Sequence, residues 1–149
     1  MSRGLLAVCV LGALLITVPA WAGWEDAVEV GAVETILGEA ENQSLEGMTA
    51  VGEVIRTRAR REGGVLKAIY RRSQFSCWNR AERAKTVERI GRVSPETLQK
   101  AWRAWWDSDG TSYAKGATHY HHRDVMPWWA VGKRPCAVIG AHRFYKNID

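Results

Sequence analysis

The sequence has few cysteines and prolines and lacks the common metal-binding signatures. Three cysteines and four prolines occur among 149 residues, and no two cysteines form a CxxC pair. A thiolate metal site is therefore not expected. The HExxH pair of zinc peptidases is also absent. Because the sequence has no internal repeat, no linker rich in proline or serine and no low-complexity tract, we expect one compact domain.

A long apolar run occurs only at the start of the sequence. Arg3 precedes an uncharged stretch from Leu5 to Val18, and Ala20-Trp21-Ala22 has the small-x-small form of a cleavage site. The stretch is shorter than the ~20 apolar residues of a bilayer span. It predicts a signal peptide over residues 1–22 and an exported catalytic domain over residues 23–149. An uncleaved membrane anchor is the alternative interpretation.

The charge balance is basic. The net charge is +5, and it falls to +4 when Arg3 leaves with the predicted signal. A basic exported domain suits an anionic polymer such as a cell wall, or an anionic membrane face. A nucleic-acid site is the rival explanation, but export favours a solvated or wall-facing surface. Six of the arginines form a cluster in the sequence: Arg56, Arg58, Arg60, Arg61, Arg71 and Arg72.

The cysteine count predicts a disulfide. Cys9 lies in the predicted signal, so Cys77 and Cys136 remain in the exported domain. An even number of cysteines in an exported protein favours pairing. Two separate buried thiols are the alternative.

Helical patterns precede short strands along the chain, which is typical of an α+β fold. Ser44 and Ser94 are expected helix N-caps, and Pro95 and Glu96 strengthen the second start. Residues 74–79 have no helical period and are expected to form a loop or short strand. Helices are predicted over 24–37, 44–60, 65–70 and 81–90 and from 94 onward, and strands over 117–121, 137–139 and 142–145.

The first predicted helix leads to an acidic side chain. Gly38 follows an apolar stretch and is expected to end or bend that helix, which turns Glu39 toward a cleft. A carboxyl group partly removed from water can keep its proton near neutral pH, as a general acid for glycosidic-bond cleavage must. Taken alone this pattern is weak, because an acid at a helix end is usually solvated.

Glu39 belongs to a series of five short motifs. These are Gly38-Glu39-Ala40, Glu46-Gly47 with Val51, Gln74-Phe75-Ser76, Gly116-Ala117-Thr118-His119-Tyr120-His121, and Ile139-Gly140-x-His142-x-Phe144-Tyr145. Their order resembles that of the SleB-like cell wall hydrolases. The resemblance spans most of residues 33–146. It implies peptidoglycan cleavage by a lysozyme-like or lytic-transglycosylase-like fold, with a helical lobe, a small antiparallel β-region and a groove between them. It also implies that Glu39 is the catalytic acid.

Other residues of these motifs are candidates for the substrate groove. Gln74 and Ser76 are expected to orient Glu39 or to contact an N-acetyl group, and loop-stabilising hydrogen bonds are the alternative. Tyr120, His121 and Trp129 are candidates for stacking on sugar rings. Core packing is the alternative for the aromatic residues. In the adjacent pairs Trp105-Trp106 and Trp128-Trp129, at least one ring must lie nearer the surface.

The number of carboxylates bears on the mechanism. Most glycosidases use two, but Glu39 is the one strong candidate here, and Asp124 is a weak second. With one acid, the oxocarbenium-like centre of N-acetylmuramic acid is captured by the C6 hydroxyl of the same sugar. The product is a 1,6-anhydro sugar, as in lytic transglycosylases. Hydrolysis by water is the alternative. No cofactor is expected.

The sequence departs from the family beside the catalytic motif. The family commonly continues Gly-Glu-Ala-Arg-Gly-Glu, whereas Glu41-Asn42-Gln43 follows here. An acid thus replaces the arginine, and an amide replaces the second acid. Whether Glu41 takes over the role of that second acid is left open by the sequence.

Two further function classes compete with glycan cleavage. In a strand, His119 and His121 share a face, as two zinc ligands do. With His122 and His142 they suggest a zinc amidase or peptidase acting on the peptide stems. A non-catalytic peptidoglycan-binding module is the third class. The favoured interpretation is a monomeric enzyme acting on peptidoglycan, with no metal, no nucleic-acid partner and no membrane span after signal cleavage.

Overall fold

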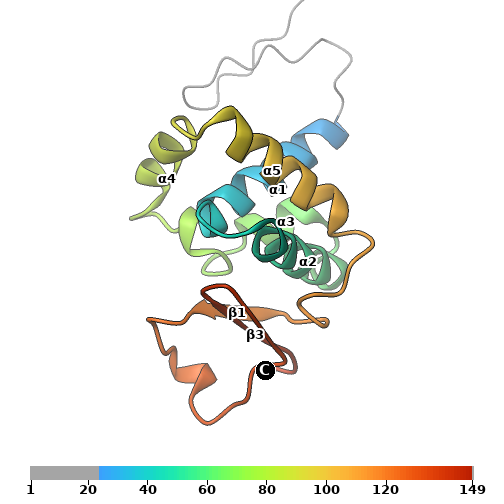
Figure 1. The fold of residues 1–149 in the computed structure, drawn as a ribbon, viewed down its shortest axis with the longest axis vertical. Coiled ribbons are helices and arrows are strands. Elements are labelled where there is room, and N and C mark those ends of the chain that lie inside the picture. Colours follow the sequence, from blue (N-terminus) through green and yellow to red (C-terminus); the bar gives the residue numbers. More distant parts are fainter. Residues whose placement is uncertain (1–23, 149) are drawn as a thin grey trace, which may run out of the picture.

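The computed structural model describes residues 24–148, so the predicted signal peptide over residues 1–22 lies outside the described residues. A larger helical lobe lies above a smaller β lobe (Figure 1). In the part of the chain that is described, no helix combines the length and apolarity needed to cross a bilayer. The expected α+β architecture is confirmed.

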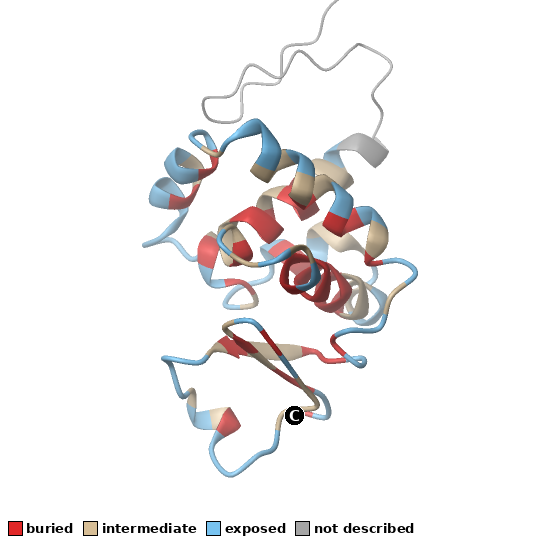
Figure 2. Cartoon of the chain, in the orientation of Figure 1, coloured by how far each residue is buried: buried red, intermediate tan, exposed pale blue. Residues whose placement is uncertain are grey.

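The helical lobe is built around α2, which packs against α1, α3 and α5. Apolar side chains from these helices form one buried cluster, and Figure 2 marks the buried stretches of this lobe in red. Fully burying a side chain of this kind contributes about 1.5–3 kcal/mol. The elements of the lobe are α1 (Trp24–Ala40), α2 (Leu45–Glu62), α3 (Val65–Tyr70), the 3-10 turn η1 (Ser76–Trp78), α4 (Arg83–Ile90) and α5 (Pro95–Asp107).

The predicted helix starts are confirmed by their capping contacts. The Ser44 hydroxyl accepts a hydrogen bond from the Gly47 N–H at 3.1 Å. The Ser94 hydroxyl accepts one from the Thr97 N–H at 3.2 Å. Each bond satisfies a backbone donor that the first helical turn leaves without a partner. Gly63 ends α2 with a φ of 77°, a conformation that glycine adopts without steric cost.

The role expected for Gly38 needs correction. Helix α1 continues through Gly38 and ends two residues later, at Ala40. A Cβ atom at position 38 would lie 2.7 Å from the Cβ of Cys77, closer than two such atoms approach. The glycine therefore allows η1 to pack directly on α1 instead of ending the helix.

The β lobe is a three-stranded antiparallel sheet with strand order β1-β3-β2. Its strands are β1 (His119–His122), β2 (Ala137–Ile139) and β3 (His142–Tyr145), and the turn η2 (Trp128–Ala130) lies between β1 and β2. Gly140 joins β2 to β3 with a φ of 54°. Strand β1 begins two residues later than predicted, because the Ala117 N–H donates to the carbonyl of Ala114 and closes a turn.

The two faces of this sheet have different neighbours. Tyr120 lies opposite Phe144 in the register, and Phe144 packs with Ala50 and Val54 of α2. Since side chains alternate along a strand, His119 and His121 point to the other face. Their rings lie 5.2 and 5.8 Å from that of Trp129. One face thus docks on the helical lobe and the other packs on the loop containing η2.

Two buried charged residues of α2 hold the connection between the lobes. The Glu53 carboxylate accepts hydrogen bonds from the Thr111 hydroxyl at 2.6 Å and from the N–H groups of Tyr113 and Ala114 at 2.9 and 2.7 Å. These contacts fix the segment between α5 and β1. The second buried residue is Arg58, which also supports the candidate site.

The expected disulfide between Cys77 and Cys136 is wrong, because both thiols are free. Cys77 is buried in the apolar cluster of the helical lobe. Cys136 packs against the separate cluster beneath the sheet, with its thiol 3.4 Å from the carbonyl oxygen of Phe144. An even cysteine count says nothing about which lobe each cysteine joins.

The tryptophan pairs divide as expected. Trp105 is 3% exposed whereas Trp106 is 59% exposed. Trp128 is 84% exposed, and Trp129 is half-buried against the β lobe. In each pair one ring packs inside and its neighbour lies at the surface.

Candidate active site

The Glu39 carboxylate lies where the two lobes meet. Its Oε1 accepts hydrogen bonds from the Ser76 hydroxyl at 3.0 Å and from the Cys77 N–H at 2.8 Å. Its Oε2 accepts one from the Tyr120 hydroxyl at 2.9 Å. The side chain is thus held by donors from η1 on one side and β1 on the other.

Cys77 contributes its backbone and not its thiol. Burial, followed by the nearby Glu39 carboxylate, raises the pKa of the Cys77 thiol far above its ordinary value. The thiol therefore stays protonated, and it is a poor nucleophile because the thiolate is the reactive form. Its N–H, by contrast, is aimed at the Glu39 oxygen by the close packing of η1 on Gly38.

Tyr120 is held by rings on several sides. Its ring lies 5.6 Å from that of Phe144, 6.5 Å from that of Phe75 and edge-on to that of His142 at 5.2 Å. Burial and then the Glu39 carboxylate raise the pKa of Tyr120 well above its ordinary value. The phenol therefore keeps its proton and serves as a fixed hydrogen-bond donor to Glu39.

Arg58 fixes both segments that supply these donors. Its Nε donates to the carbonyl of Thr118 at 2.7 Å, just before β1, and its Nη1 donates to the carbonyl of Gln74, just before η1. The guanidinium lies 4.6 Å from the centre of the Phe75 ring. Burial lowers the pKa of Arg58, while Tyr120 and then Glu39 oppose that shift.

The residues that depart from the family pattern lie beside the junction. Glu41 pairs with Arg89 at 3.5 Å. The Gln43 side-chain oxygen accepts a hydrogen bond from the Ala141 N–H at 3.0 Å, and Lys100 donates to the Gln43 carbonyl at 2.9 Å. Gln43 therefore ties the α1–α2 connector to the turn between β2 and β3.

The structure brings together only part of the predicted site. Ser76 and Tyr120 donate hydrogen bonds to Glu39, and their roles toward a substrate stay predictions. The Gln74 side chain is half-buried and makes no hydrogen bond within residues 24–148; its backbone binds Arg58. His121 points away from Glu39, because it alternates with Tyr120 along β1.

His121 and Trp129 belong to the far face of the sheet. The two ring nitrogens of His121 lie 3.0 Å from the Tyr145 hydroxyl and 2.8 Å from the His122 carbonyl. Trp129 packs edge-on to the rings of His121 and Tyr145. Their sugar-stacking role stays a prediction.

No second carboxyl joins Glu39 within the described residues. Asp124 is exposed and lies 3.2 Å from His122. Glu34, one turn earlier on α1, is half-buried; burial raises its pKa, and Arg83 opposes that shift. Neither makes a hydrogen bond to Glu39 or to its donors.

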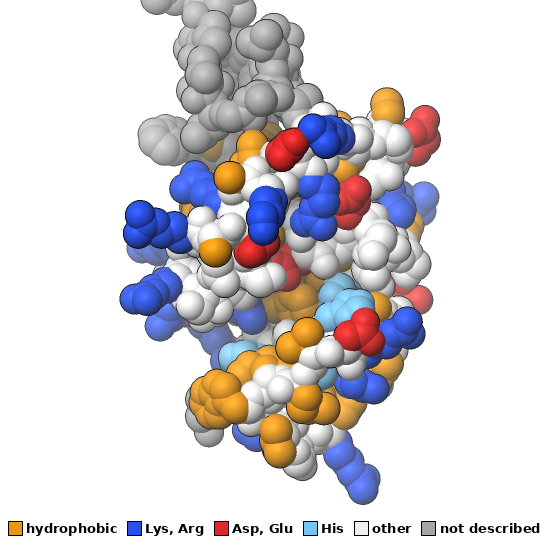
Figure 3. Space-filling model, turned by 90° about the vertical axis from the view of Figure 1, so that its left-hand side faces the viewer, with side chains coloured by type: hydrophobic (Ala, Val, Ile, Leu, Met, Phe, Trp, Pro, Cys, Tyr) orange, Lys and Arg blue, Asp and Glu red, His pale blue; other side chains and the backbone are white. Residues whose placement is uncertain are grey.

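The histidines do not assemble into a metal site. Across residues 24–148, no group of three or more His, Cys, Asp or Glu side chains is placed to hold an ion. Figure 3 shows histidine side chains gathered where the lobes meet, below basic side chains of the helical lobe. Desolvation lowers the pKa of His142, and its Nδ1 has no hydrogen-bond partner among the described residues.

Two hollows flank η1. The smaller has a volume of about 300 Å³ and shares Gly38, Ser76 and Cys77 with the surroundings of Glu39. The larger, of about 540 Å³, lies against Phe75 and Trp78. Glu39 itself lies in the lining of neither. Sequence reasoning missed the Cys77 N–H, Arg58 and Gln43; of these, only the place of Arg58 on the apolar face of its helix signalled a buried role.

Comparisons with known proteins agree with this architecture. A family model described as Cell Wall Hydrolase matches residues 42–145, beginning just after Glu39. No curated protein matches the sequence.

Two solved structures have a similar fold. The catalytic domain of the SleB protein of Bacillus cereus aligns with a TM-score of 0.64 and 21% identity, over 91% of this chain and 100% of that domain. The catalytic domain of the germination-specific lytic transglycosylase SleB from Bacillus anthracis aligns with a TM-score of 0.61 and 23% identity, over 87% of this chain and 100% of that domain. The expected lysozyme-like fold and hydrolase class are confirmed, and the chain belongs to the cell wall hydrolase family.

Proposed function

We propose that the protein cleaves the glycan strands of peptidoglycan, with Glu39 as the general acid and then the general base. The observation that carries this proposal is the setting of one carboxylate at the lobe junction, held by the Ser76 hydroxyl, the Cys77 N–H and the Tyr120 hydroxyl. A general acid must be fixed within hydrogen-bond reach of the leaving oxygen. Donors from two lobes provide that fixed position.

The reaction proceeds in two steps. Protonated Glu39 gives its proton to the glycosidic oxygen after N-acetylmuramic acid, and the bond from C1 to that oxygen breaks with its electron pair going to the oxygen. The C6 hydroxyl of the same sugar then attacks C1 and gives its proton to Glu39. The product is a 1,6-anhydro sugar, and the acid is regenerated for the next cycle.

The two oxygens of Glu39 have different roles in this scheme. Oε1 is occupied by two donors, one of them a backbone N–H that can only donate. Oε2 has a single contact, from Tyr120, and is therefore the oxygen with room to exchange a proton with substrate. The hydrogen bond from Tyr120 fixes the orientation of Oε2.

Capture by the C6 hydroxyl is preferred to capture by water for a structural reason. An inverting or retaining glycosidase needs a second carboxylate flanking the bond, and in residues 24–148 no other carboxylate shares a hydrogen-bond donor with Glu39. Substrate-assisted capture needs only one. Hydrolysis, as in a muramidase, is the alternative outcome of the same cleavage.

Export completes the proposal. The substrate lies outside the cytoplasm, which agrees with a signal peptide over residues 1–22. We expect the enzyme to act as a monomer without a cofactor. The nucleic-acid alternative is weakened because two arginines of the basic cluster, Arg56 and Arg58, are engaged in contacts within the protein.

Mass spectrometry of the products tests the proposal. The purified protein, its Glu39→Gln variant and a matched Glu88→Gln control on the exposed face of α4 are incubated with peptidoglycan. Glu39→Gln is expected to fold normally and to lose activity by a factor of about 100 to 10,000. The control is expected to match the parent protein.

The masses distinguish the chemistries. Muropeptides ending in anhydro-muramic acid support the transglycosylase scheme. Products heavier by one water molecule contradict the transglycosylase scheme and indicate hydrolysis, which requires a base to activate that water. Free stem peptides whose release stops with a chelator contradict glycan cleavage and favour the zinc amidase. A folded Glu39→Gln variant with full activity removes Glu39 from the mechanism.

A further inference from the structure

The basic cluster seen in the sequence divides into arginines that stabilise the fold and arginines that face solvent. Arg56 donates to the Ser108 hydroxyl at 2.8 Å and to the Trp105 carbonyl at 3.0 Å. Arg71 pairs with Glu62. Arg72, by contrast, makes no ion pair or side-chain hydrogen bond within residues 24–148. These differences show which charges remain available to a ligand.

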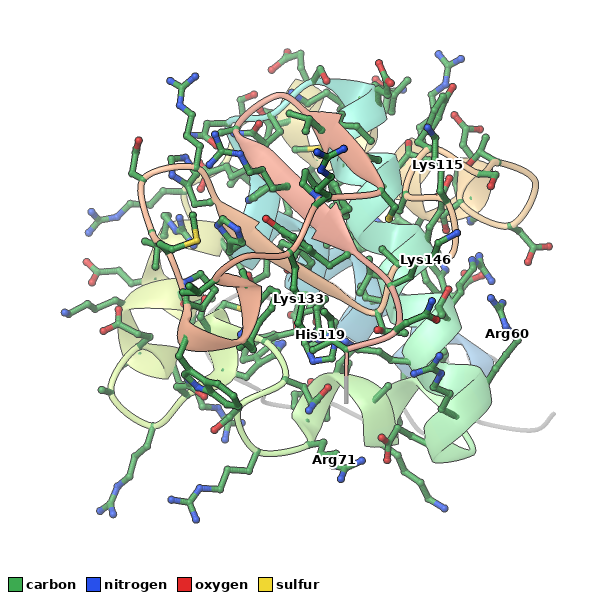
Figure 4. The ribbon with its side chains drawn as sticks, turned by 90° about the horizontal axis from the view of Figure 1, so that it is seen from below. Arg60, Arg71, Lys115, His119, Lys133 and Lys146 are labelled. Carbon is green, nitrogen blue, oxygen red and sulfur yellow. The ribbon has the colours of Figure 1, made fainter. Side chains whose placement is uncertain are left out.

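The available charges border the larger hollow beside η1. Arg80 resembles Arg72 in being exposed and without a charged partner in the described part of the chain. In Figure 4, Arg71 extends from the end of α3 at the rim of the molecule. The hollow, at about 540 Å³, falls in the size range of ligand sites. The residues used in the argument are Tyr70, Arg71, Arg72, Phe75, Trp78 and Arg80.

Aromatic rings form the other part of the lining. The rings of Tyr70 and Trp78 lie 5.5 Å apart and tilted by 59°. The Trp78 N–H is already used, since it donates to the Thr35 hydroxyl at 2.8 Å. The rings therefore offer apolar surface more than hydrogen bonds. Cationic groups beside such surface suit a ligand that has both an acid group and an apolar part.

The turn over residues 71–74, which carries Arg71 and Arg72, is held in place by hydrogen bonds. Ser73 adopts a φ of 62°, and the Gln74 N–H donates to the Arg71 carbonyl at 3.1 Å in a tight turn. Arg58 binds the Gln74 carbonyl from inside the protein. The turn is therefore anchored to the same residue that positions the donors of Glu39.

The hollow is adjacent to the candidate active site. Phe75 lines it and also lies 6.5 Å, ring centre to ring centre, from Tyr120, which contacts Glu39. Ser76 and Cys77, the next residues, donate to Glu39. A glycan strand cleaved at Glu39 therefore carries its substituents past this loop.

We propose that this hollow binds the carboxylate groups of the peptide stems that the glycan strand carries. The planar guanidinium groups of Arg72 and Arg80 match carboxylates in two-point hydrogen bonding, and the rings of Tyr70 and Trp78 pack against the apolar side chains of the stem. This inference rests on the proposed function and adds to it a preference for strands that still bear peptides.

The test compares two substrates and two double variants. Arg72→Gln with Arg80→Gln removes the two unpaired charges of the hollow. Arg92→Gln with Arg103→Gln removes one exposed charge from the turn after α4 and one from α5, and it matches the change in net charge. Each is assayed on peptidoglycan with intact stems and on strands stripped of their stems by an amidase.

The expected result is specific to one variant and one substrate. The Arg72/Arg80 double variant shows a roughly tenfold higher KM on stem-bearing strands, as expected for the loss of charge-assisted hydrogen bonds, with kcat within about twofold. On stripped strands it matches the parent protein, and the Arg92/Arg103 control matches it on both. Equal KM values for parent and variant on stem-bearing strands, or an equal loss in the control, overturn the inference.

A binding measurement keeps this test independent of catalysis. Titration of the full-length protein with a soluble stem tetrapeptide is expected to show saturable binding that the Arg72/Arg80 variant loses. If the parent protein cleaves neither substrate, the proposed function fails, while this titration still decides the inference. Saturable binding of a glycerol-phosphate oligomer without binding of the tetrapeptide overturns the assignment to carboxylates.

Discussion

The helical lobe and the β lobe are stabilised by different kinds of contact. The core of the helical lobe is mainly aliphatic, with Ile36, Leu37 and Met48 fully buried. The β lobe has only short strands, and its interior is rich in aromatic and imidazole rings such as those of His121 and Tyr145, stacked 5.4 Å apart. The helical lobe supplies the larger apolar core, and the β lobe depends on it.

Glu39 lies at the junction of these two lobes. It comes from the rigid end of α1, whereas Tyr120 comes from the sheet, so their contact reports how the lobes are docked. Docking is maintained by side chains that reach across, chiefly Arg58 and Gln43. Substitutions at the junction should therefore lower activity more than substitutions within either lobe that cost the same stability.

The largest effect on stability is expected at the anchor between the lobes. Arg58→Met removes the donors from the buried carbonyl of Thr118 and the half-buried carbonyl of Gln74 while retaining much of the side-chain volume. Unsatisfied buried groups cost about 1–3 kcal/mol each, so we expect the free energy of unfolding to fall by about 3 kcal/mol. Urea unfolding measures this change.

The matched control separates docking from charge. Arg103→Met lies on the exposed face of α5, where substitutions change stability by less than about 0.5 kcal/mol. At temperatures where the Arg58→Met protein is still folded, its activity should also fall, because η1 and β1 lose their common anchor. A variant as stable and active as the control would show that the lobes dock without Arg58.

A smaller effect is expected where η1 meets α1. Gly38→Ala places a methyl group 2.7 Å from the Cys77 Cβ, and overpacking of this kind costs about 1–3 kcal/mol. The Cys77 N–H must then move away from Glu39. Gly110→Ala, where no atom lies within 4 Å of the added Cβ, is the control.

The readout for Gly38→Ala is the ratio of lost activity to lost stability. We expect kcat to fall at temperatures where thermal unfolding shows the variant to be fully folded. If kcat is unchanged while the melting temperature drops, the close packing serves the fold alone, and the Cys77 contact does not position Glu39.

The sequence was informative where the signal is local. Ser44 and Ser94 cap their helices because capping depends on a few neighbouring residues. Glu39, Ser76 and Tyr120 were identified from motif order and are brought together by the fold. A backbone donor such as the Cys77 N–H has no side-chain signature, so no pattern indicated it.

Long-range contacts account for the remaining differences. Gly38 can mean a helix end or a close approach, and only the position of η1 decides between them. The pairing of Cys77 with Cys136 was predicted from a count, although the two residues pack in different clusters. Gln43 was seen only as a missing acid, because its partner Ala141 is 98 residues away.

Acid should weaken the β lobe before the helical lobe, because all four histidines lie in it. Burial lowers the pKa of both His119 and His142. The unfolded chain therefore binds protons more readily, and the stability present above a pH of about 6.5 declines as the pH falls through that value toward the lower folded pKa. Urea unfolding at pH 7.5 and at pH 5 measures the decline.

His142→Phe sharpens this prediction. The substitution removes a buried ring nitrogen that has no partner in the described structure, and we expect it to reduce the loss of stability between the two pH values. Hydrogen exchange should show that the extra opening at pH 5 is confined to β1 and β3. An equal pH dependence in the variant would assign the decline to other groups.

The smallest expected effect is that of a reducing agent, which should be none. Cys77 lies in the helical lobe and Cys136 in the β lobe, and the two thiols are not bonded to each other. Dithiothreitol should therefore leave the melting temperature unchanged, whereas a drop would mean that a disulfide joins the lobes. Thiol labelling sharpens the result: Cys77, whose pKa is raised by burial, should react only when the helical lobe unfolds. Labelling of Cys77 in the folded protein would instead show that η1 moves away from α1 and from Glu39 on the timescale of the labelling reaction.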